Sequence, residues 1–135
     1  MKMGKKMLSV SLCVCILVTI MCCPTACAAV QSNWYIDSYS SQLSISDGQV
    51  RVDFSTYNAR IMTTIGASKV SLYEDGYLVA TFYSSSTPNM VGTNTCYYYG
   101  YVTYPANSGS FYYAVVTHYA ADSSGSGVEY TYPAS

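Results

Sequence analysis

Charged side chains are scarce in this chain of 135 residues, which contains six lysines and arginines and seven aspartates and glutamates. Three of the basic residues lie within the first six positions, and only Arg51, Arg60 and Lys69 follow them. Three scattered cations cannot neutralise a run of phosphates or bind the surface of an anionic membrane. The sequence therefore argues against nucleic-acid binding and against electrostatic attachment to a membrane.

Cysteine and histidine are scarce as well. Five of the six cysteines lie between residues 13 and 27, so Cys96 is the only one in the rest of the chain, and His118 is the only histidine. A single cysteine cannot form a disulfide within its own chain, and these two residues cannot complete a metal site of cysteine and histidine ligands. We therefore expect no metal and no cofactor, and a domain held together by burial and hydrogen bonding.

The N-terminus has the three-part layout of a secretory signal peptide. Three lysines precede an apolar run from Met7 to Cys23, and Ala26 and Ala28 then form an A-x-A cleavage pattern. We predict cleavage after Ala28 or one residue later, and a protein that is secreted into the medium or associated with the cell wall.

Two alternatives to a cleaved signal exist. The first is an uncleaved membrane anchor, since the apolar run of 17 residues just reaches the shortest length that spans a bilayer. Lipid attachment is the second, and it is disfavoured because neither Cys22 nor Cys27 has an aliphatic residue three positions earlier.

Removal of residues 1–28 leaves 107 residues, 29–135, with three basic and seven acidic side chains and a net charge of −4. All twenty aromatic residues, sixteen of them tyrosine, fall in this part. The length suits one domain with its own core, and many apolar residues with few charges are the opposite of the composition of disordered chains. We predict a signal peptide at 1–28 and a single folded domain at 29–135.

Apolar and polar residues alternate along most of this domain. In the stretch QVRVDFS, the apolar Val50, Val52 and Phe54 alternate with polar residues, which predicts a strand with one buried and one exposed face. Asp75-Gly76 lies between two such runs and is a strong signal for a hairpin. The segment 57–65 lacks this period, and we expect a short helical turn there. The predicted strands are Tyr35–Ile45, Gln49–Ser55, the hairpin Lys69–Tyr83, Thr95–Tyr104, Ser110–Ala120 and Gly127–Tyr132.

About seven strands in roughly 100 residues are typical of an all-β, immunoglobulin or fibronectin type III-like antiparallel β-sandwich. The pattern Gly109-x-x-Tyr112-x-Ala114-x-Val116 resembles the F strand of these families. The resemblance implies that Tyr112 is a buried structural residue whose hydroxyl hydrogen-bonds to the backbone of the preceding turn. The chain departs from both families, since it has no tryptophan at 69–83 and no cysteine pair within the domain.

Three longer stretches, YIDSYSSQLSISDGQVRVDF, MTTIGASKVSLYEDG and GSFYYAVVTHYA, resemble small secreted proteins of unknown function from Gram-positive, gut-dwelling bacteria of the Firmicutes type. This resemblance extends over most of the domain. It implies secretion and the immunoglobulin-like sandwich, and it supplies no active site to transfer to this chain.

Cys96 and His118 are the strongest candidates for catalysis, because a histidine can activate a cysteine nucleophile. The strands that carry them are expected in opposite sheets, where the two side chains meet only across the core and a buried thiol is inert. No two carboxylates are placed to face each other as in a glycosidase. The serine-rich loop after Asp122 offers few oxygen ligands for calcium. We therefore expect no enzymatic activity, and an unreactive, structural Cys96.

The stretch CYYYGYVTY, residues 96–104, concentrates tyrosine on both sides of one predicted strand. Because alternate residues of a strand face opposite sides, Tyr97, Tyr99 and Tyr101 share one face, and the even-numbered residues from Cys96 onward share the other. The thiol and a valine favour the even-numbered face as the inner one, which leaves an exposed row of three tyrosines. The strand propensity of tyrosine is the simpler explanation for its abundance. Gly100 on the inner face indicates a bulge or the close approach of another backbone.

Two functions of different classes follow. The first is a binding module that contacts an extracellular glycan or protein through Tyr97, Tyr99 and Tyr101, since rigid amphipathic rings are favoured contact residues. The alternative is a small structural or self-assembling extracellular protein whose surface, rich in tyrosine, serine and glycine, pairs with copies of itself. An enzyme is the least supported class, because no convergent polar site is apparent.

Overall fold

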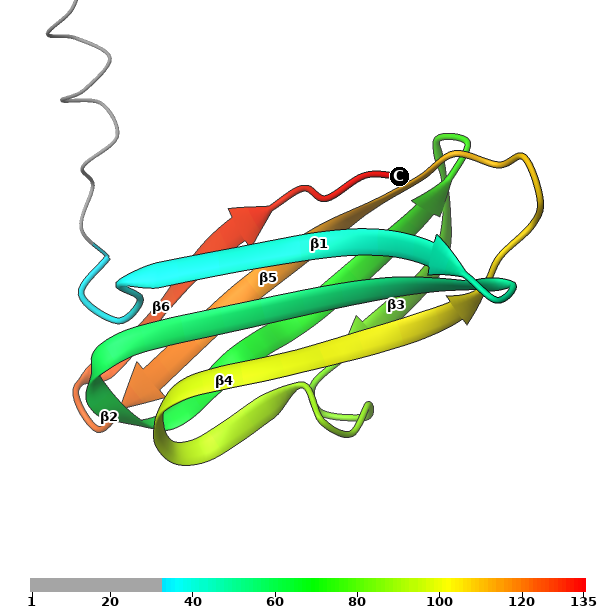
Figure 1. Cartoon of the computed structure of the whole chain (residues 1–135). Coiled ribbons are helices and arrows are strands. Elements are labelled where there is room, and N and C mark those ends of the chain that lie inside the picture. Colours follow the sequence, from blue (N-terminus) through cyan, green and yellow to red (C-terminus); the bar gives the residue numbers. More distant parts are fainter. Residues whose placement is uncertain (1–32) are drawn as a thin grey trace, which may run out of the picture. The chain divides into compact units, whose positions relative to one another are not determined.

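The computed structural model describes residues 33–135 and shows an all-β domain, with no helix in that range (Figure 1). The predicted signal peptide at 1–28 lies outside the described residues. Because residues 33–135 contain no helix, this part of the chain has no helix long and apolar enough to cross a membrane. The six strands are β1 (Ser38–Ser46), β2 (Gln49–Glu74), β3 (Tyr77–Tyr83), β4 (Val91–Pro105), β5 (Tyr112–Asp122) and β6 (Gly125–Thr131).

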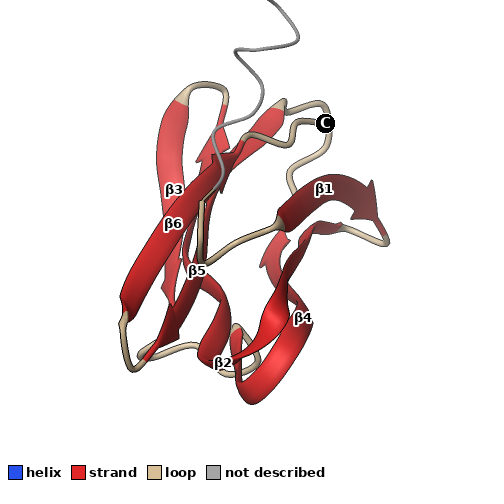
Figure 2. Ribbon diagram, turned by 90° about the vertical axis from the view of Figure 1, so that its left-hand side faces the viewer, coloured by secondary structure: helices blue, strands red, loops and turns tan. Residues whose placement is uncertain are grey.

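The long strand β2 organises the sheet, because each of its two parts pairs on both edges. Residues 49–57 lie between β1 and β4, and residues 69–74 lie between β3 and β5. β6 extends the sheet beyond β5, and all of these pairs are antiparallel. The sheet curls around its apolar face into a half-barrel (Figure 2). We call β1, β4 and residues 49–57 of β2 the front half of the sheet, and β3, β5, β6 and residues 64–74 of β2 the back half.

Two predictions about β2 were wrong. The predicted strand Gln49–Ser55 and the first strand of the predicted hairpin are parts of one continuous strand, so the described residues form six strands where about seven were expected. The predicted helical turn at 57–65 is extended backbone within that same strand. The register of β2 shifts between Tyr57 and Met62 against β4, and again after Ala67 against β5. Such irregularities interrupt the alternation in the sequence and bend the strand without ending it.

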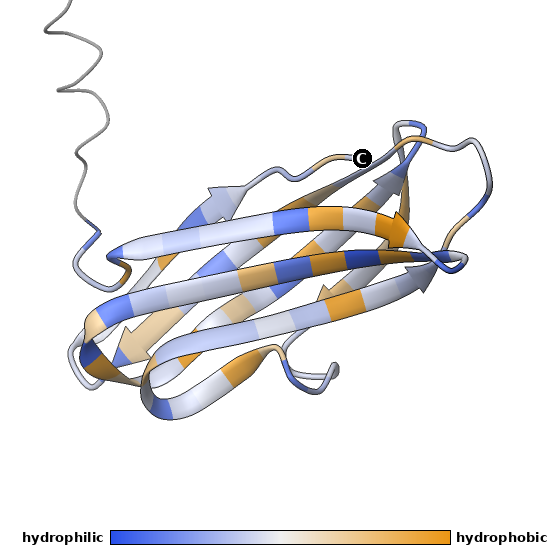
Figure 3. Ribbon diagram, in the orientation of Figure 1, coloured by the Kyte–Doolittle hydropathy of each residue, from blue (hydrophilic) through white to orange (hydrophobic). Residues whose placement is uncertain are grey.

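The alternation along β2 places its apolar side chains inside, as predicted. Val50, Val52 and Phe54 are each 1% exposed, and Figure 3 shows apolar and polar residues alternating along the ribbon. The hairpin at Asp75-Gly76 is confirmed as well, since both residues have the positive φ, 47° and 87°, that a tight two-residue loop requires. The main core cluster consists of Leu43, Val50, Val52, Phe54, Ala67, Val70, Leu72, Met90, Val102, Tyr112, Ala114 and Val116.

Tyr112 begins β5 and is completely buried in this core. Its hydroxyl accepts a hydrogen bond of 2.8 Å from the backbone N–H of Asn107, in the turn before β5. This is the contact that the resemblance to immunoglobulin-like domains implies. The hydroxyl thus ties the turn to the first residue of the strand.

We predict that Tyr112→Phe lowers the free energy of unfolding by about 0.5–1.5 kcal/mol, the usual net value of one hydrogen bond. The phenylalanine ring still fills the site, so the loss comes from the Asn107 N–H that is left without its partner. Tyr77→Phe is the matched control, because Tyr77 is 77% exposed. Denaturant unfolding followed by circular dichroism measures both variants, and a wild-type midpoint for Tyr112→Phe would contradict the structural role.

Candidate functional site

The outer surface of the front half carries the three tyrosines that the alternation predicted to be exposed. Tyr97, Tyr99 and Tyr101 of β4 are 51%, 49% and 46% exposed. The register of β4 against β2 aligns Tyr99 with Ser55 and Tyr101 with Asp53. We call this surface the tyrosine face; it comprises Ser40 and Gln42 of β1, Arg51, Asp53, Ser55 and Tyr57 of β2, and Tyr97, Tyr99 and Tyr101 of β4.

Four side chains at the centre of the tyrosine face contact one another. Arg51 Nε donates to Asp53 Oδ1 over 2.9 Å, and Arg51 Nη2 donates to the Tyr99 hydroxyl over 3.0 Å. The Tyr99 hydroxyl in turn donates to Asp53 Oδ1. The guanidinium carbon of Arg51 lies 3.8 Å from the centre of the Tyr101 ring, in a cation–π contact. The hydrogen bond to Asp53, and after it the one to Tyr99, raises the pKa of Arg51. The positive charge of Arg51 and the negative charge of Asp53 compensate each other.

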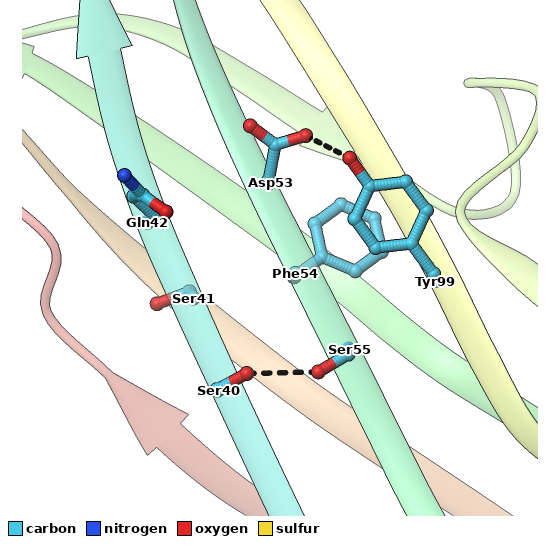
Figure 4. Close-up of a pocket in the computed structure, with 7 residues that line it drawn as sticks. All are labelled: Ser40, Ser41, Gln42, Asp53, Phe54, Ser55 and Tyr99. Carbon is cyan, nitrogen blue, oxygen red and sulfur yellow. Dashed lines mark hydrogen bonds between the residues drawn. The ribbon is translucent and has the colours of Figure 1, made fainter.

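A shallow hollow of about 260 Å³ lies beside the Tyr99 ring (Figure 4). The hydroxyls of Ser40 and Ser55 are hydrogen-bonded across it at 2.8 Å. The second carboxylate oxygen of Asp53 points away from Tyr99 and toward β1 (Figure 4). The hollow is smaller than the roughly 300–1,000 Å³ of a pocket for a drug-sized ligand, so it suits one small unit of a larger ligand. It is lined by Ser40, Ser41, Gln42, Asp53, Phe54, Ser55 and Tyr99.

The partners of the tyrosines were not predicted from the sequence. Asp53 was only one of the polar residues that alternate with Val50, Val52 and Phe54, and Arg51 was considered only as a scattered cation. A signal was available, because residues two apart in a strand share a face and Arg51 and Asp53 have opposite charges. Their contact with Tyr99 could not be predicted from alternation, because it depends on the register between β2 and β4. Asp53 and Tyr99 are 46 residues apart in the chain.

His118 is completely buried within a chain of hydrogen bonds that crosses the half-barrel. The Thr56 hydroxyl donates to the Gly66 carbonyl over 2.9 Å, so it accepts from His118 Nδ1, which lies 2.9 Å away. Nε2 then accepts from the Thr131 hydroxyl over 2.8 Å, and the Thr131 oxygen accepts from Ser41. Burial lowers the pKa of His118 to about 4, which keeps the ring neutral at physiological pH. Both ring nitrogens therefore have structural partners.

Cys96 shares the inner side of β4 with the buried Val102, but its own side chain is only half-buried. The pairing of β2 with β4 is interrupted between Tyr57 and Met62, and Cys96 falls opposite this interruption. The sheet does not close over the thiol there, so Cys96 is not buried as expected, and its low reactivity stays a prediction. Because both ring nitrogens of His118 bond to threonines, the two residues do not form a catalytic pair.

Gly100 marks the close approach of another backbone, as its place on the inner face indicated. The carbonyl oxygen of Asn89 lies 2.6 Å from where a Cβ at residue 100 would stand, and the ring of Phe54 lies 2.8 Å from the same point. The absence of a side chain therefore lets the segment before β4 pack directly on that strand.

Asp122 is occupied by contacts within the protein. Its Oδ1 accepts hydrogen bonds from the backbone N–H and the hydroxyl of Ser124, and its Oδ2 lies 3.4 Å from Arg60 Nη1. The Ser124 bonds are the largest cause of a lowered pKa for Asp122. Within residues 33–135, no three side chains of His, Cys, Asp or Glu are grouped so as to hold a metal ion.

No protein family model and no curated protein matches this chain. Among solved structures, this chain is similar to the crystal structure of a protein from Archaeoglobus fulgidus, with 9% sequence identity and a TM-score of 0.42. The superposition covers 74% of this chain and 94% of the archaeal chain. The function is therefore inferred from the geometry of the tyrosine face.

Proposed function

We propose that residues 29–135 form a secreted, non-enzymatic binding module that contacts an extracellular glycan or protein through Tyr97, Tyr99 and Tyr101. The observation that supports this function is a row of three half-exposed rings, one of which is held by the ion pair beside it. Rigid aromatic rings provide a large contact area and lose little conformational freedom on binding. A surface of this kind is suited to recognition and has no nucleophile with an activating base.

Replacing Tyr97, Tyr99 and Tyr101 together by serine is expected to abolish ligand binding and to leave the domain folded. About half of each ring is already in contact with water, so the core loses little when the three rings are removed. Binding is measured on arrays of glycans and of purified extracellular proteins, and folding is measured by circular dichroism.

The matched control replaces three other exposed tyrosines, Tyr77, Tyr130 and Tyr132, by serine. This variant removes the same number of rings and is expected to bind like the wild type. Unfolding of the tyrosine-face variant would show that its rings are structural, and wild-type binding by a folded variant would show that the ligand lies elsewhere.

A small structural or self-assembling protein is the second candidate, and the outer surface of the back half favours it. Tyr83 on β3 and Tyr130 on β6 are each 49% exposed, and Val128 is 44% exposed. The rings of Tyr73 and Tyr113 stack on this surface with their centres 4.6 Å apart. Exposed apolar surface of this kind often marks an interface.

In sedimentation experiments, a Tyr83→Ser/Tyr130→Ser variant should lose assembly through this surface and retain binding at the tyrosine face.

Export and a relation to immunoglobulin-like sandwiches belong to the same proposal. The lysine-rich start and the A-x-A pattern support export, and N-terminal sequencing of secreted material should find Ala29 or Val30 first. A start at Met1 or a lipid-modified cysteine would contradict it. The Tyr112 hydroxyl bonded to the preceding turn supports the relation to immunoglobulin and fibronectin type III domains.

A further inference from the structure

We propose that the tyrosine face binds a neutral glycan, with one sugar unit in the hollow beside Tyr99 and the glycan chain running along β4 past Tyr97. This inference rests on the proposed function and narrows its ligand from a glycan or protein to an uncharged polysaccharide. It also adds Asp53, Ser40 and Ser55 to the residues that contact the ligand.

The charges of the tyrosine face disfavour an anionic ligand. Arg51 and Asp53 are its only charged residues, and their side chains are joined by a hydrogen bond of 2.9 Å. The guanidinium of Arg51 is further engaged by the Tyr99 hydroxyl and by the Tyr101 ring. An acidic sugar would meet the Asp53 carboxylate with no free cation to compensate it, and the net charge of −4 after residue 28 adds to the repulsion.

The polar groups around the hollow match the hydroxyls of a sugar. The Ser40 and Ser55 hydroxyls and the Gln42 amide each provide donors and acceptors. Both hydrogen bonds that Asp53 receives end on Oδ1, while Oδ2 points toward β1 (Figure 4). Oδ2 is thus an acceptor for a sugar hydroxyl, and hydrogen bonds to an ionised acceptor are the stronger ones.

The Tyr99 ring provides an apolar wall for the hollow. A sugar ring presents C–H groups on its face, which pack on an aromatic ring, while its hydroxyls project sideways to polar groups. Because the Tyr99 hydroxyl is bonded to Arg51 and Asp53, the ring loses little freedom on binding. One face of Tyr101 is covered by Arg51, so the next ring for a second sugar is Tyr97, about 7 Å away after two strand rises of roughly 3.3 Å.

A protein ligand suits this surface less well. Hot spots of protein interfaces are well-packed pockets from which water is excluded, whereas this hollow is shallow, and five of its seven lining residues are serine, glutamine or aspartate. The hollow has room for one sugar ring. A neutral glycan is therefore the ligand class that the observations favour.

The test measures binding of the purified protein to soluble neutral polysaccharides (glucan, mannan and xylan) and to acidic ones (polygalacturonate and hyaluronate) by calorimetry. The wild type is expected to bind at least one neutral polysaccharide and no acidic one. Asp53→Asn should weaken neutral binding about tenfold and allow acidic binding, because Arg51 loses its counter-charge. Asp47→Asn is the control, since it makes the same charge change in the β1–β2 turn, where asparagine tolerates the φ of 51°.

The outcomes distinguish a failure of this inference from a failure of the proposed function. Wild-type binding of acidic polysaccharide or protein, lost when Tyr97, Tyr99 and Tyr101 become serine, would overturn the neutral-glycan inference and leave the proposed function standing. Neutral-glycan binding that survives this triple replacement would overturn both. Absence of binding to every neutral polysaccharide would also overturn the inference. If Asp53→Asn does not fold, Gln42→Ala at the opposite rim provides the test: severalfold weaker neutral binding supports the inference, and unchanged affinity contradicts it.

Discussion

Replacing Gly66 by alanine is expected to lower the free energy of unfolding by about 2–6 kcal/mol, a large part of the 5–15 kcal/mol typical of a small domain. The added Cβ would collide with the carbonyl oxygen of Met90 and would stand 2.8 Å from the Cα of Val91. The Met90 carbonyl cannot withdraw freely, because it accepts a hydrogen bond of 2.9 Å from the Ala67 N–H. In addition, the φ of Gly66 is 150°, a value that residues with a side chain rarely adopt.

Gly109→Ala is the matched control for this variant. Gly109 has a positive φ of 82°, but an added Cβ there meets nothing within 4 Å. The control therefore carries backbone strain without a collision, at a cost of about 1 kcal/mol or somewhat more. Denaturant unfolding of both variants measures the difference, and equal midpoints would contradict a close contact between the bend of β2 and the segment before β4.

The domain is expected to lose about 2 kcal/mol of stability between pH 7 and pH 5 because of His118. Burial holds the pKa of His118 at about 4 in the folded protein, whereas an ordinary histidine titrates at 6.5. Between these values the unfolded chain binds a proton that the folded protein does not, so the free energy of unfolding rises with pH. The stabilisation is complete above pH 6.5 and disappears as the pH falls to about 4, for a total of about 3 kcal/mol.

Two carboxylates with lowered pKa values titrate below this window. Around the imidazole, the Tyr39 ring lies with its centre 5.3 Å away, and Glu129 stands opposite on β6. Glu74 and Asp122 have lowered pKa values, from ordinary values of 4.5 and 3.8, so they change charge below pH 5. The stability loss between pH 7 and pH 5 is therefore assigned to His118.

His118→Gln tests this assignment, because glutamine keeps one donor and one acceptor and does not titrate. Its unfolding free energy should be nearly constant between pH 7 and pH 5, and a wild-type pH dependence in the variant would contradict the prediction. Nuclear magnetic resonance measures the pKa of His118 directly in the wild type, because the imidazole signals of the only histidine are unambiguous. A midpoint near 6.5 in the folded protein would show that the buried network is not present.

Local patterns in the sequence were sufficient to locate most of the strands, apart from the segment 57–65, and to predict which way most side chains face. Val50, Val52 and Phe54 are inside, and Tyr97 and Tyr99 are outside, because alternation along a strand is a property of the strand itself. The hairpin at residues 75–76 was predictable for the same reason, since its turn depends on two adjacent residues. The composition alone also showed that no second cysteine beyond residue 28 can form a disulfide with Cys96.

Only the tertiary structure decided how these strands are joined and which side chains meet. The bend of β2 turns two predicted strands into one, because β4 pairs with β2 on both sides of the interruption between Tyr57 and Met62, and β5 pairs with β2 from Thr64 onward. The contacts of Arg51 and Asp53 with Tyr99, and those of His118 with Thr56 and Thr131, join residues that are distant in the chain. Such contacts depend on the register between strands, and a register is selected by the packing of the whole core rather than by any single stretch of sequence.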